Sequence, residues 1–304
     1  TADTWVHTAA GPRQVRELVG TAFNARVNGV DHASGPEGFF KTAEKAVIGI
    51  ETAEGYRLRL TVDHRVLRVA RQTRDGAVTE WCEAGHLRAG DRVVLHDHRA
   101  ASEWAGEYTR EQGYLLGLLA GDGTLKADKA VLSVWQPAAV ANGATGELSS
   151  GVRAVMAEAL EAVRTLPHRA DFAGWSMVAG RSEYRLSTAS LKHLAEEAGM
   201  RPGAKRITPR MERGSSAFHR GFLRGLFDAD GSVQGDQQKG VSVRLAQSDA
   251  GTIESVQRML LRLGIVAHVY LERRAAGTSR LPDGKGGERH YATRAQHELV
   301  ISGE

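Results

Sequence analysis

The stretches GLLAGDGTL (residues 117–125) and GLFDADGSV (residues 225–233) place an apolar segment followed by Asp-Gly in this chain twice. Each apolar segment predicts a helix that ends at its acid, Asp122 or Asp230. Backbone carbonyls at a helix C-terminus carry partial negative charge, which disfavours a carboxylate there unless a cation lies nearby. The duplication therefore predicts two acids that need a positive charge.

Each predicted helix also holds a glycine one turn before its end, Gly117 or Gly225. Glycine in a helix interior costs ~1 kcal/mol relative to alanine, and close approach of the two helices supplies a reason for it. Two such helices, packed along an approximate two-fold axis, would bring Asp122 and Asp230 to the same end. Divalent cations would relieve the repulsion, and paired acids with bridging metals activate water against phosphodiesters. The alternative, that each Asp-Gly only caps a helix and starts a turn, explains one copy better than two.

The character of the sequence changes near residues 96–106. Before this point, short alternating runs separated by turn residues predict an all-β region, and they are VIGIET (47–52), YRLRLTV (56–62), HRVLRVA (64–70) and DRVVL (91–95). After it, helical periods alternate with strands, which predicts an α+β region. Both Asp-Gly helices start the same order of elements there. We therefore expect two αββαββα repeats, the second of which stops at Glu304 before its last helix.

Composition limits the class of protein. The chain has 304 residues, 41% of them apolar, and no apolar run near 18 residues, which suits a soluble two-domain chain without membrane association. No signal peptide is recognisable at the start. The single Cys82 excludes an intramolecular disulfide and a multi-cysteine zinc site, favours a cytoplasmic setting, and is expected to be a buried structural thiol on a strand. The triplet His96-Asp97-His98 has no further ligands nearby in the sequence and is interpreted as a linker.

Charge is distributed unevenly along the chain. Residues 1–103 hold 14 basic and 14 acidic side chains and the remaining residues hold 26 and 22, so the formal net charge of +4 lies in the second region. Such a bias suits nucleic acid, although solvated surfaces produce similar values.

At the two Asp-Gly helices the sequence resembles the LAGLIDADG homing endonucleases. LRGLFDADG (223–231) differs from the family pattern at two positions, and LLGLLAGDG (115–123) has Ala120 and Gly121 where the pattern has Asp and Ala. The acid that family members use is kept in both copies, as Asp122 and Asp230. The resemblance covers residues 112–304 in order and spacing. It implies that residues 104–304 form a monomeric, pseudo-symmetric, Mg²⁺-dependent endonuclease that makes double-strand breaks in DNA, with both acids as catalytic metal ligands.

The same resemblance implies further site residues. Family members lay two antiparallel sheets into the DNA major groove, and the candidates for that surface are Arg181, Arg185, Arg244, Arg273, Arg274, Arg289 and Lys285. They also place a lysine-containing stretch ahead of the second motif, here AKRITP (204–209). Lys205 is thereby implied to be a base-side or charge-stabilising residue near the cleaved phosphate. The alternative is a solvated loop lysine.

Residues 1–103 resemble the N-terminal part of inteins, whose horseshoe of β-strands, the Hint fold, also occurs in hedgehog-type autoprocessing domains. The resemblance rests on DTWVHTAAG (3–11), TVDH (61–64) and GDRVVL (90–95). It implies that Thr61 and His64, three apart on one strand end, polarise the scissile amide for an N-to-S acyl shift. Residues 37–67, EGFFKTAEKAVIGIETAEGYRLRLTVDHRVL, further resemble inteins inserted in ribonucleotide reductases, so host-protein exteins are implied partners.

Two departures from inteins bear on the function. An initial Cys or Ser and a final His-Asn pair are missing, so the chain as given cannot splice, and we expect a complete gene to encode a helix and a β segment ending in His-Asn after Glu304. Three function classes remain. They are an intein with an active homing endonuclease, an intein whose nuclease has decayed to DNA binding or a folded passenger, and a hedgehog-like autoprocessing protein, which the two nuclease motifs disfavour.

Overall fold

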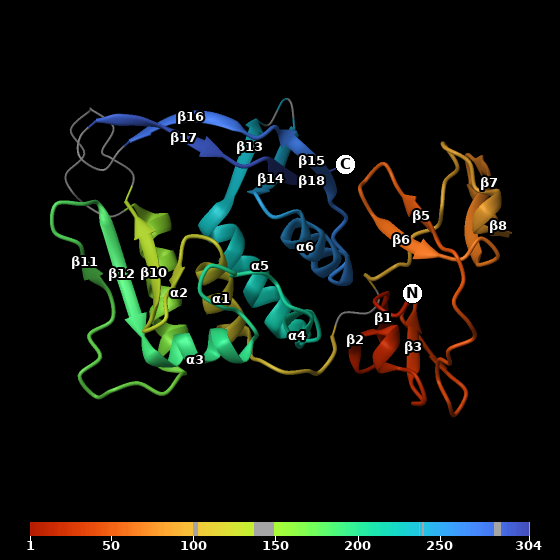
Figure 1. Cartoon of the computed structure of the whole chain (residues 1–304), viewed down its shortest axis with the longest axis horizontal. Helices are drawn as coiled ribbons and strands as arrows, with labels where there is room; N and C mark the ends of the chain where they lie inside the picture. The colour runs from red at the N-terminus through yellow and green to blue at the C-terminus, as the bar shows by residue number, and fades with distance from the viewer. Residues whose placement is uncertain (100–102, 137–148, 237, 239, 283–286, 304) are drawn as a thin grey trace. The chain divides into compact units, whose positions relative to one another are not determined.

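The computed structural model describes residues 1–99, 103–136, 149–236, 238, 240–282 and 287–303. The chain divides into two compact units, Thr1–Trp104 with Leu261–Ile265 and Ala105–Leu260 with Val266–Glu304 (Figure 1). No helix in the described ranges is long and apolar enough to cross a membrane.

Residues 1–104 are built from strands and two short 3-10 turns, η1 (Val15–Glu17) and η2 (Ala84–His86). A four-stranded sheet has the order β2-β1-β3-β4, and β5-β6 and β7-β8 are separate antiparallel pairs. The bounds are β1 Trp5–Thr8, β2 Gly11–Gln14, β3 Asn24–Val27, β4 Val30–Ala33, β5 Ile48–Glu51, β6 Arg57–Leu60, β7 Arg65–Thr73 and β8 Gly76–Glu83. No α-helix lies in the described part of residues 1–104. Whether these strands form the Hint horseshoe stays a prediction.

Two expectations for this unit are wrong. The run DRVVL forms no extended strand, because its pairing with β7 is limited to the bridge of Val93 with Arg68 and the two backbone hydrogen bonds beside it, from Val69 N–H to the carbonyl of Arg92 and from Val94 N–H to that of Leu67. Cys82 lies on β8 as expected but is half-buried rather than buried, since a two-stranded ribbon covers a side chain incompletely.

The triplet 96–98 is more than a linker, because His7 of β1 joins its two imidazoles. The ring centroid of His7 lies 5.3 Å from that of His98, and the rings of His96 and His98 are 4.0 Å apart. Burial lowers the pKa of His7 to about 4 and that of His98 to about 3. The described residues nevertheless contain no group of three or more His, Cys, Asp or Glu side chains arranged to hold a metal ion.

The low pKa values of His7 and His98 predict an acid-sensitive unit. Both imidazoles stay neutral in the folded chain below their ordinary pKa of 6.5, whereas the unfolded chain takes up protons there. The free energy of unfolding should therefore fall as the pH drops from about 7 towards 4, by at most about 1.4 kcal/mol per pH unit for each ring. NMR titration of the ring protons and urea unfolding at several pH values check this. His98→Asn should flatten the dependence, and titration of both rings near 6.5 would contradict it.

The second unit contains two copies of one arrangement, a four-stranded sheet backed by helices. Strands β9 (Thr124–Leu125), β10 (Ala130–Trp135), β11 (Ser176–Met177) and β12 (Glu183–Thr188) form a sheet in the order β11-β12-β10-β9. Strands β13 (Gly231–Asp236), β14 (Gly240–Gln247), β15 (His268–Arg274) and β18 (Gln296–Ser302) form a second in the equivalent order β13-β14-β18-β15. Strands β16 (Gly277–Pro282) and β17 (Glu288–Thr293) are an additional ribbon in the second copy. The α+β class predicted for this region is confirmed.

Helices in equivalent places back the two sheets. They are α1 (Arg110–Ala120), α2 (Ser150–Arg164) and α3 (Ala189–Glu197) in the first copy, and α5 (Ser216–Asp230) and α6 (Ala250–Arg262) in the second, with the short α4 (Pro209–Glu212) between them. The side chains of Thr109 and Ser215 cap the N-termini of α1 and α5 by accepting hydrogen bonds from backbone N–H groups. Leu116 and Leu119 of α1 and Phe222 of α5 are fully buried. Packing of these apolar faces fixes where the two motif helices end.

Candidate functional site

Helices α1 and α5 pack backbone to backbone at their glycines. A methyl group on Gly117 would stand 2.7 Å from the backbone nitrogen of Leu226, and one on Gly225 would stand 2.9 Å from that of Leu118. These separations are shorter than side-chain carbons tolerate, so only glycine fits at this crossing. Gly113 and Gly221, one turn earlier on each helix, make the same close approach. The four glycines set the distance between the two helix ends.

The two motif acids emerge at that meeting point with a small difference between the copies. Asp230 is the last residue of α5, whereas α1 ends at Ala120 and Asp122 follows its C-cap, Gly121. A methyl group on Gly121 would lie 3.1 Å from the Asp230 carboxylate, so the first motif touches the acid of the second. Segments more than a hundred residues apart in the sequence thus meet here.

Lys205 lies near enough to both acids for their charges to act on its ammonium group, and it is not a solvated lysine. Its Nζ donates hydrogen bonds to the backbone carbonyls of Leu119 and Gly121, at 2.9 Å each, and also to that of Gly123. The carbonyls of Leu119 and Gly121 lie at the C-terminal end of α1, where the partial negative charge of the helix gathers, and that of Gly123 lies in the turn that follows. The ammonium group therefore caps the first motif helix. The alternative of a solvated loop lysine is wrong, because the loop before α4 packs against the end of α1 and the Lys205 ammonium binds backbone carbonyls there.

The pKa values of the three charged groups reflect partial loss of solvent around their charged atoms, although the Asp122 residue is exposed whereas Lys205 and Asp230 are half-buried. Burial raises the pKa of the Asp122 carboxyl, while Lys205 opposes this. Burial and then the Asp122 charge raise the pKa of Asp230, and a hydrogen bond from Gln247 and the charge of Lys205 oppose it. Burial lowers the pKa of Lys205, which both acids counteract. Two carboxylates against one ammonium leave a site that favours additional positive charge.

The donor set fits a hard divalent cation. Carboxylate and carbonyl oxygens are the ligands that Mg²⁺ and Ca²⁺ prefer, and Mg²⁺ commonly binds through one or two carboxylates with water and phosphate oxygens completing the shell. Asp122 and Asp230 supply two such carboxylates, and within the described ranges no third acidic or imidazole ligand joins them. A cation held here would therefore keep positions open for a substrate phosphate.

Loss of the Lys205 ammonium should destabilise the fold. Lys205→Met removes three charge-assisted hydrogen bonds and leaves the carbonyls at the end of α1 without their donor, which should lower the free energy of unfolding by about 2 kcal/mol. Lys129→Met is the matched control, because Lys129 is exposed and makes only a loose ion pair with its neighbour Asp128. Urea unfolding of both variants gives the comparison. Equal stabilities would show that the ammonium does not cap α1.

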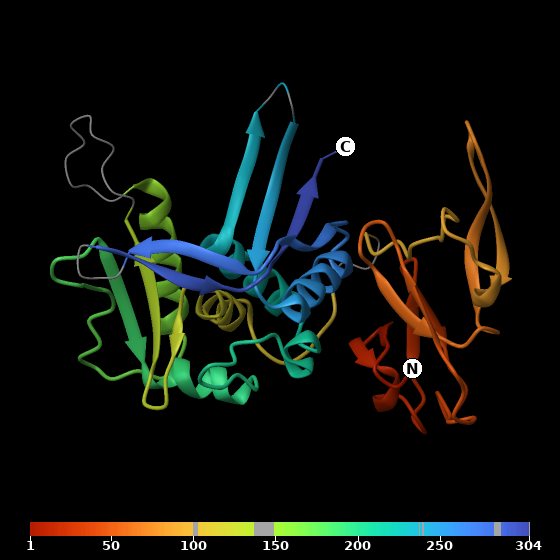
Figure 2. The ribbon, with the colours of Figure 1, turned by 45° about the horizontal axis from the view of Figure 1, so that its top comes forward.

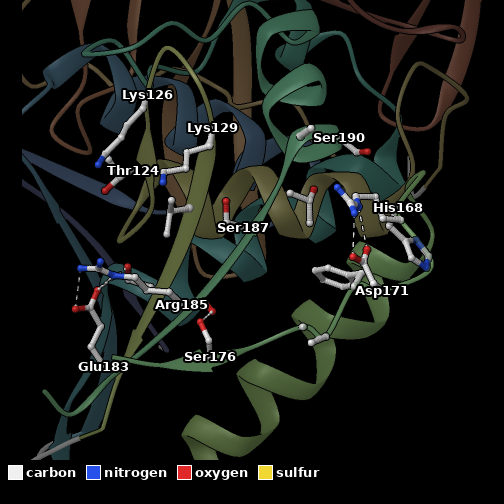
Figure 3. A pocket seen from close by; sticks show the side chains of 18 of the residues that line it. Thr124, Lys126, Lys129, His168, Asp171, Ser176, Glu183, Arg185, Ser187 and Ser190 are labelled. Atoms are coloured by element: carbon white, nitrogen blue, oxygen red, sulfur yellow. Dashed lines mark hydrogen bonds and ion pairs between the residues drawn. The ribbon is translucent and has the colours of Figure 1, made fainter. Parts of the chain in front are cut away.

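The open face of the first sheet is a groove of about 1040 Å³ that reaches Asp122 (Figure 3). Alternate residues of β10 and β12 line it, including Ser133, Glu183 and Arg185, because side chains on one face of a strand recur every second residue. Glu183 is almost fully buried, and its carboxylate accepts hydrogen bonds from Arg185 at 2.6 and 3.0 Å. The pair fixes a guanidinium on the face of the sheet.

The second sheet has a comparable arrangement. Arg244 of β14 and Arg273 of β15 both lie beside Glu298 of β18, at 3.5 and 2.7 Å. In the first sheet, Arg181 and Arg185 likewise form ion pairs with Glu183. In both sheets a glutamate therefore holds arginines that stay partly exposed. Exposed guanidinium groups held in this way suit phosphate and base-edge contacts.

The structure places the remaining predicted DNA contacts less centrally. Arg274 ends β15 and Arg289 lies on the β16–β17 ribbon, so neither stands on the central strands of the second sheet. Lys285 lies outside the described residues.

Several site residues were missed from the sequence. Lys126 and Lys129 flank the β9–β10 turn and line the first groove with Trp135. The two lysines in TLKADKA are the signal that could have revealed this positive charge. The side-chain amide of Gln247, which donates to the Asp230 carboxylate, carried no such signal, because its approach depends on the pairing of β13 with β14.

Thr61 and His64 lie in the other unit and not on one strand end, so that expectation is wrong. Thr61 directly follows β6, His64 directly precedes β7, and the backbone N–H of His64 donates to the carbonyl of Thr61 at 3.1 Å across a tight turn. The turn brings the two residues close in space. His64 is exposed and Thr61 half-buried.

Comparison with known proteins gives one family match. Residues 217–304 match the model of the LAGLIDADG-like domain, which covers the second motif helix and the second sheet. This match agrees with the predicted resemblance for the second copy.

Curated relatives cover much of the chain at low identity. The chain is 22% identical over 260 residues to the alpha chain of the ribonucleoside-diphosphate reductase NrdEB of Bacillus subtilis (strain 168), an alignment of 84% of this chain and 23% of that protein. It is also 22% identical over 238 residues to the A chain of DNA gyrase of Mycolicibacterium flavescens, covering 76% of this chain and 40% of that protein. The chain thus spans less than half the length of these relatives.

Solved structures are similar to about two thirds of the chain. Mesophilic variants of the homing endonuclease I-DmoI cover 64% of this chain and 88% of theirs, with 17% identity and a TM-score of 0.35. The N-terminal LAGLIDADG domain of DUF199/WhiA covers 64% and 78%, with 16% identity and a TM-score of 0.34.

Proposed function

We propose that residues 105–304 are a metal-dependent DNA endonuclease of the homing type. The proposal rests on one observation above others, namely that Asp122 and Asp230, from two copies of one motif, meet with Lys205 at the ends of two helices in backbone contact. Paired acids, Asp230 half-buried and Asp122 exposed, at the edge of an open sheet suit hydrolysis of a phosphodiester.

Each residue of the site has a role in this proposal. Asp122 and Asp230 would hold Mg²⁺, which when bound polarises the scissile phosphate and lowers the pKa of attacking water. Lys205 limits the repulsion between the acids and fixes the end of α1. Arg185 and Arg244 would orient the duplex on the two sheets. The chain would act as a monomer, since both acids come from one chain, and we propose the cytoplasm as its setting.

The test is cleavage of a plasmid that carries the uninterrupted host-gene segment. Incubation with Mg²⁺ should produce linear DNA, and EDTA should prevent it. Tight binding without cleavage in Mg²⁺ or Mn²⁺ would instead support the alternative of a decayed nuclease that only binds DNA. If the chain neither bound nor cleaved the DNA, the proposal for this unit would be overturned.

We also infer that residues 1–104 are the N-terminal part of an intein splicing domain. The inference is supported by the turn that joins Thr61 to His64 and by partial alignments to two relatives whose names denote different enzymes. A segment that matches parts of proteins with different names is expected of an element inserted into host genes. A hedgehog-like autoprocessing role is the second candidate for the same strands. Host-protein exteins, including ribonucleotide reductase, would then be the partners.

The splicing proposal predicts a chemical role for His64. A chain with a Cys and an N-extein added at its start should release that extein when a thiol is supplied, because the imidazole protonates the leaving amide nitrogen. His64→Ala should slow the release at least ~100-fold. His86→Ala is the matched control on an exposed imidazole of the same unit. Equal release rates in gel assays would reduce His64 to a structural residue.

A further inference from the structure

The β16–β17 ribbon is an insertion that distinguishes the second repeat from the first. In the first repeat a tight turn over residues 178–182 joins β11 to β12, closed by a hydrogen bond from Val178 N–H to the carbonyl of Glu183 at 2.9 Å. In the second repeat the ribbon occupies the corresponding connection between β15 and β18. Its strands pair only with each other, from Gly277 with Thr293 to Pro282 with Glu288.

The ribbon has little support from a core. Its side chains, where they are described, are exposed or half-exposed, and none is buried. A two-stranded hairpin alone is only marginally stable in water, so such a ribbon gains stability by lying against a partner. Figures 1 and 2 both show the ribbon running from the second sheet towards the first, rather than folding back on its own sheet.

Positive charge identifies the kind of partner. The ribbon and its two ends carry arginines at positions 273, 274, 280, 289 and 294. Arg273 and Arg280 are neutralised by ion pairs with Glu298 and Glu288. Among the described residues no ion pair is made by Arg274, Arg289 or Arg294, and all three are exposed. Three uncompensated guanidinium groups on an extended, uncovered ribbon suit a polyanion with regularly spaced charges.

We propose that the β16–β17 ribbon is a DNA-contact arm that binds backbone phosphates in addition to those contacted by the two sheets. The proposal rests on the proposed DNA-binding function and adds to it a phosphate-binding element that the first repeat lacks. Arg274, Arg289 and Arg294 contact phosphates, and Tyr291, partly exposed on the same ribbon, packs beside the sugar-phosphate backbone. The arm therefore contributes affinity and length of contact, and the acids between α1 and α5 carry out the chemistry.

Two variants of the full chain test the arm. In the first, residues 275–295 are replaced by the five-residue turn 178–182 of the first repeat, which joins equivalent strands. In the second, Arg274, Arg289 and Arg294 are changed to Gln and the ribbon is kept. Loss of three phosphate contacts should weaken binding about 100-fold near 0.15 M salt and reduce the slope of log Kd against log salt by about 3. The segment of host-gene duplex protected from nuclease digestion should also shorten.

The outcomes separate the arm from the proposed function. If the wild-type chain binds no duplex under any of these conditions, the DNA function itself fails. If the wild-type chain binds the duplex and both variants match its affinity, salt slope and footprint, the proposed role of the ribbon is overturned. The proposed DNA-binding function of the unit then stands. A change in sedimentation without a change in DNA binding would assign the ribbon to contact between copies of the chain and would also overturn the proposal. If the shortened variant fails to fold, the triple Gln variant by itself tests whether the ribbon contacts DNA.

Discussion

Replacing either Asp122 or Asp230 with Asn should abolish double-strand cleavage while leaving DNA binding within about tenfold of wild type. Asn keeps the shape of the side chain but removes the negative charge that would hold a divalent cation, so we expect the rate to fall at least ~1,000-fold, equivalent to about 4 kcal/mol of transition-state stabilisation. Binding should persist because phosphate contacts by Arg and Lys side chains supply most of the affinity. Linearisation of the host-gene plasmid and a gel-shift titration measure the two effects.

Asp128→Asn provides the matched control for this experiment. Asp128 lies in the turn between β9 and β10, close in sequence to Asp122, and is exposed beside Lys129. Removal of its charge should leave cleavage within about twofold of wild type, because surface charges of this kind contribute little. Wild-type rates in Asp122→Asn or Asp230→Asn would overturn the assignment of that acid.

Adding one methyl group at the crossing of α1 and α5 should destabilise the second unit severely. Gly117→Ala or Gly225→Ala places a carbon 2.7 or 2.9 Å from a backbone nitrogen of the facing helix, and backbone cannot move aside as a flexible side chain can. The helices must separate, which should lower the free energy of unfolding by about 3 kcal/mol or more. Chemical unfolding followed by helical circular dichroism measures the loss.

Gly151→Ala on α2 is the control, because its Cβ would meet no atom within 4 Å. This change should be neutral or should stabilise the chain by up to ~1 kcal/mol, since alanine is the better helix former. An equal effect at all three positions would mean that helix propensity, rather than close approach, accounts for the glycines. Retained stability in Gly117→Ala would exclude the close crossing itself.

The prediction from sequence was strongest where the information is local. A helix signals itself by apolar spacing, and the repeated Asp-Gly ending and the glycine one turn before it mark the same place on two helices. The α+β class of the second region follows from such patterns because each element is encoded by consecutive residues. The strand runs of residues 47–70 are local in the same sense, since alternation of exposed and covered side chains is a property of each strand.

The tertiary structure decided the features that depend on distant partners. Lys205 could be assigned to solvent or to the site until the chain path brought its ammonium to carbonyls 82 to 86 residues away. Gln247 reaches Asp230, and His7 joins His96 and His98, only through strand pairing and packing.

The DRVVL run also shows that local sequence cannot predict contacts with distant backbone. It has the pattern of a strand, but a strand exists only where a neighbouring backbone offers hydrogen bonds along its length, and here a single bridge forms at Val93. The sequence by itself thus determined the two motif helices, their acids and the glycines between them, because these depend on spacing along one helix. Only the tertiary structure decided which side chains lie near those acids and which strand-like runs pair, because such contacts depend on the path of the whole backbone.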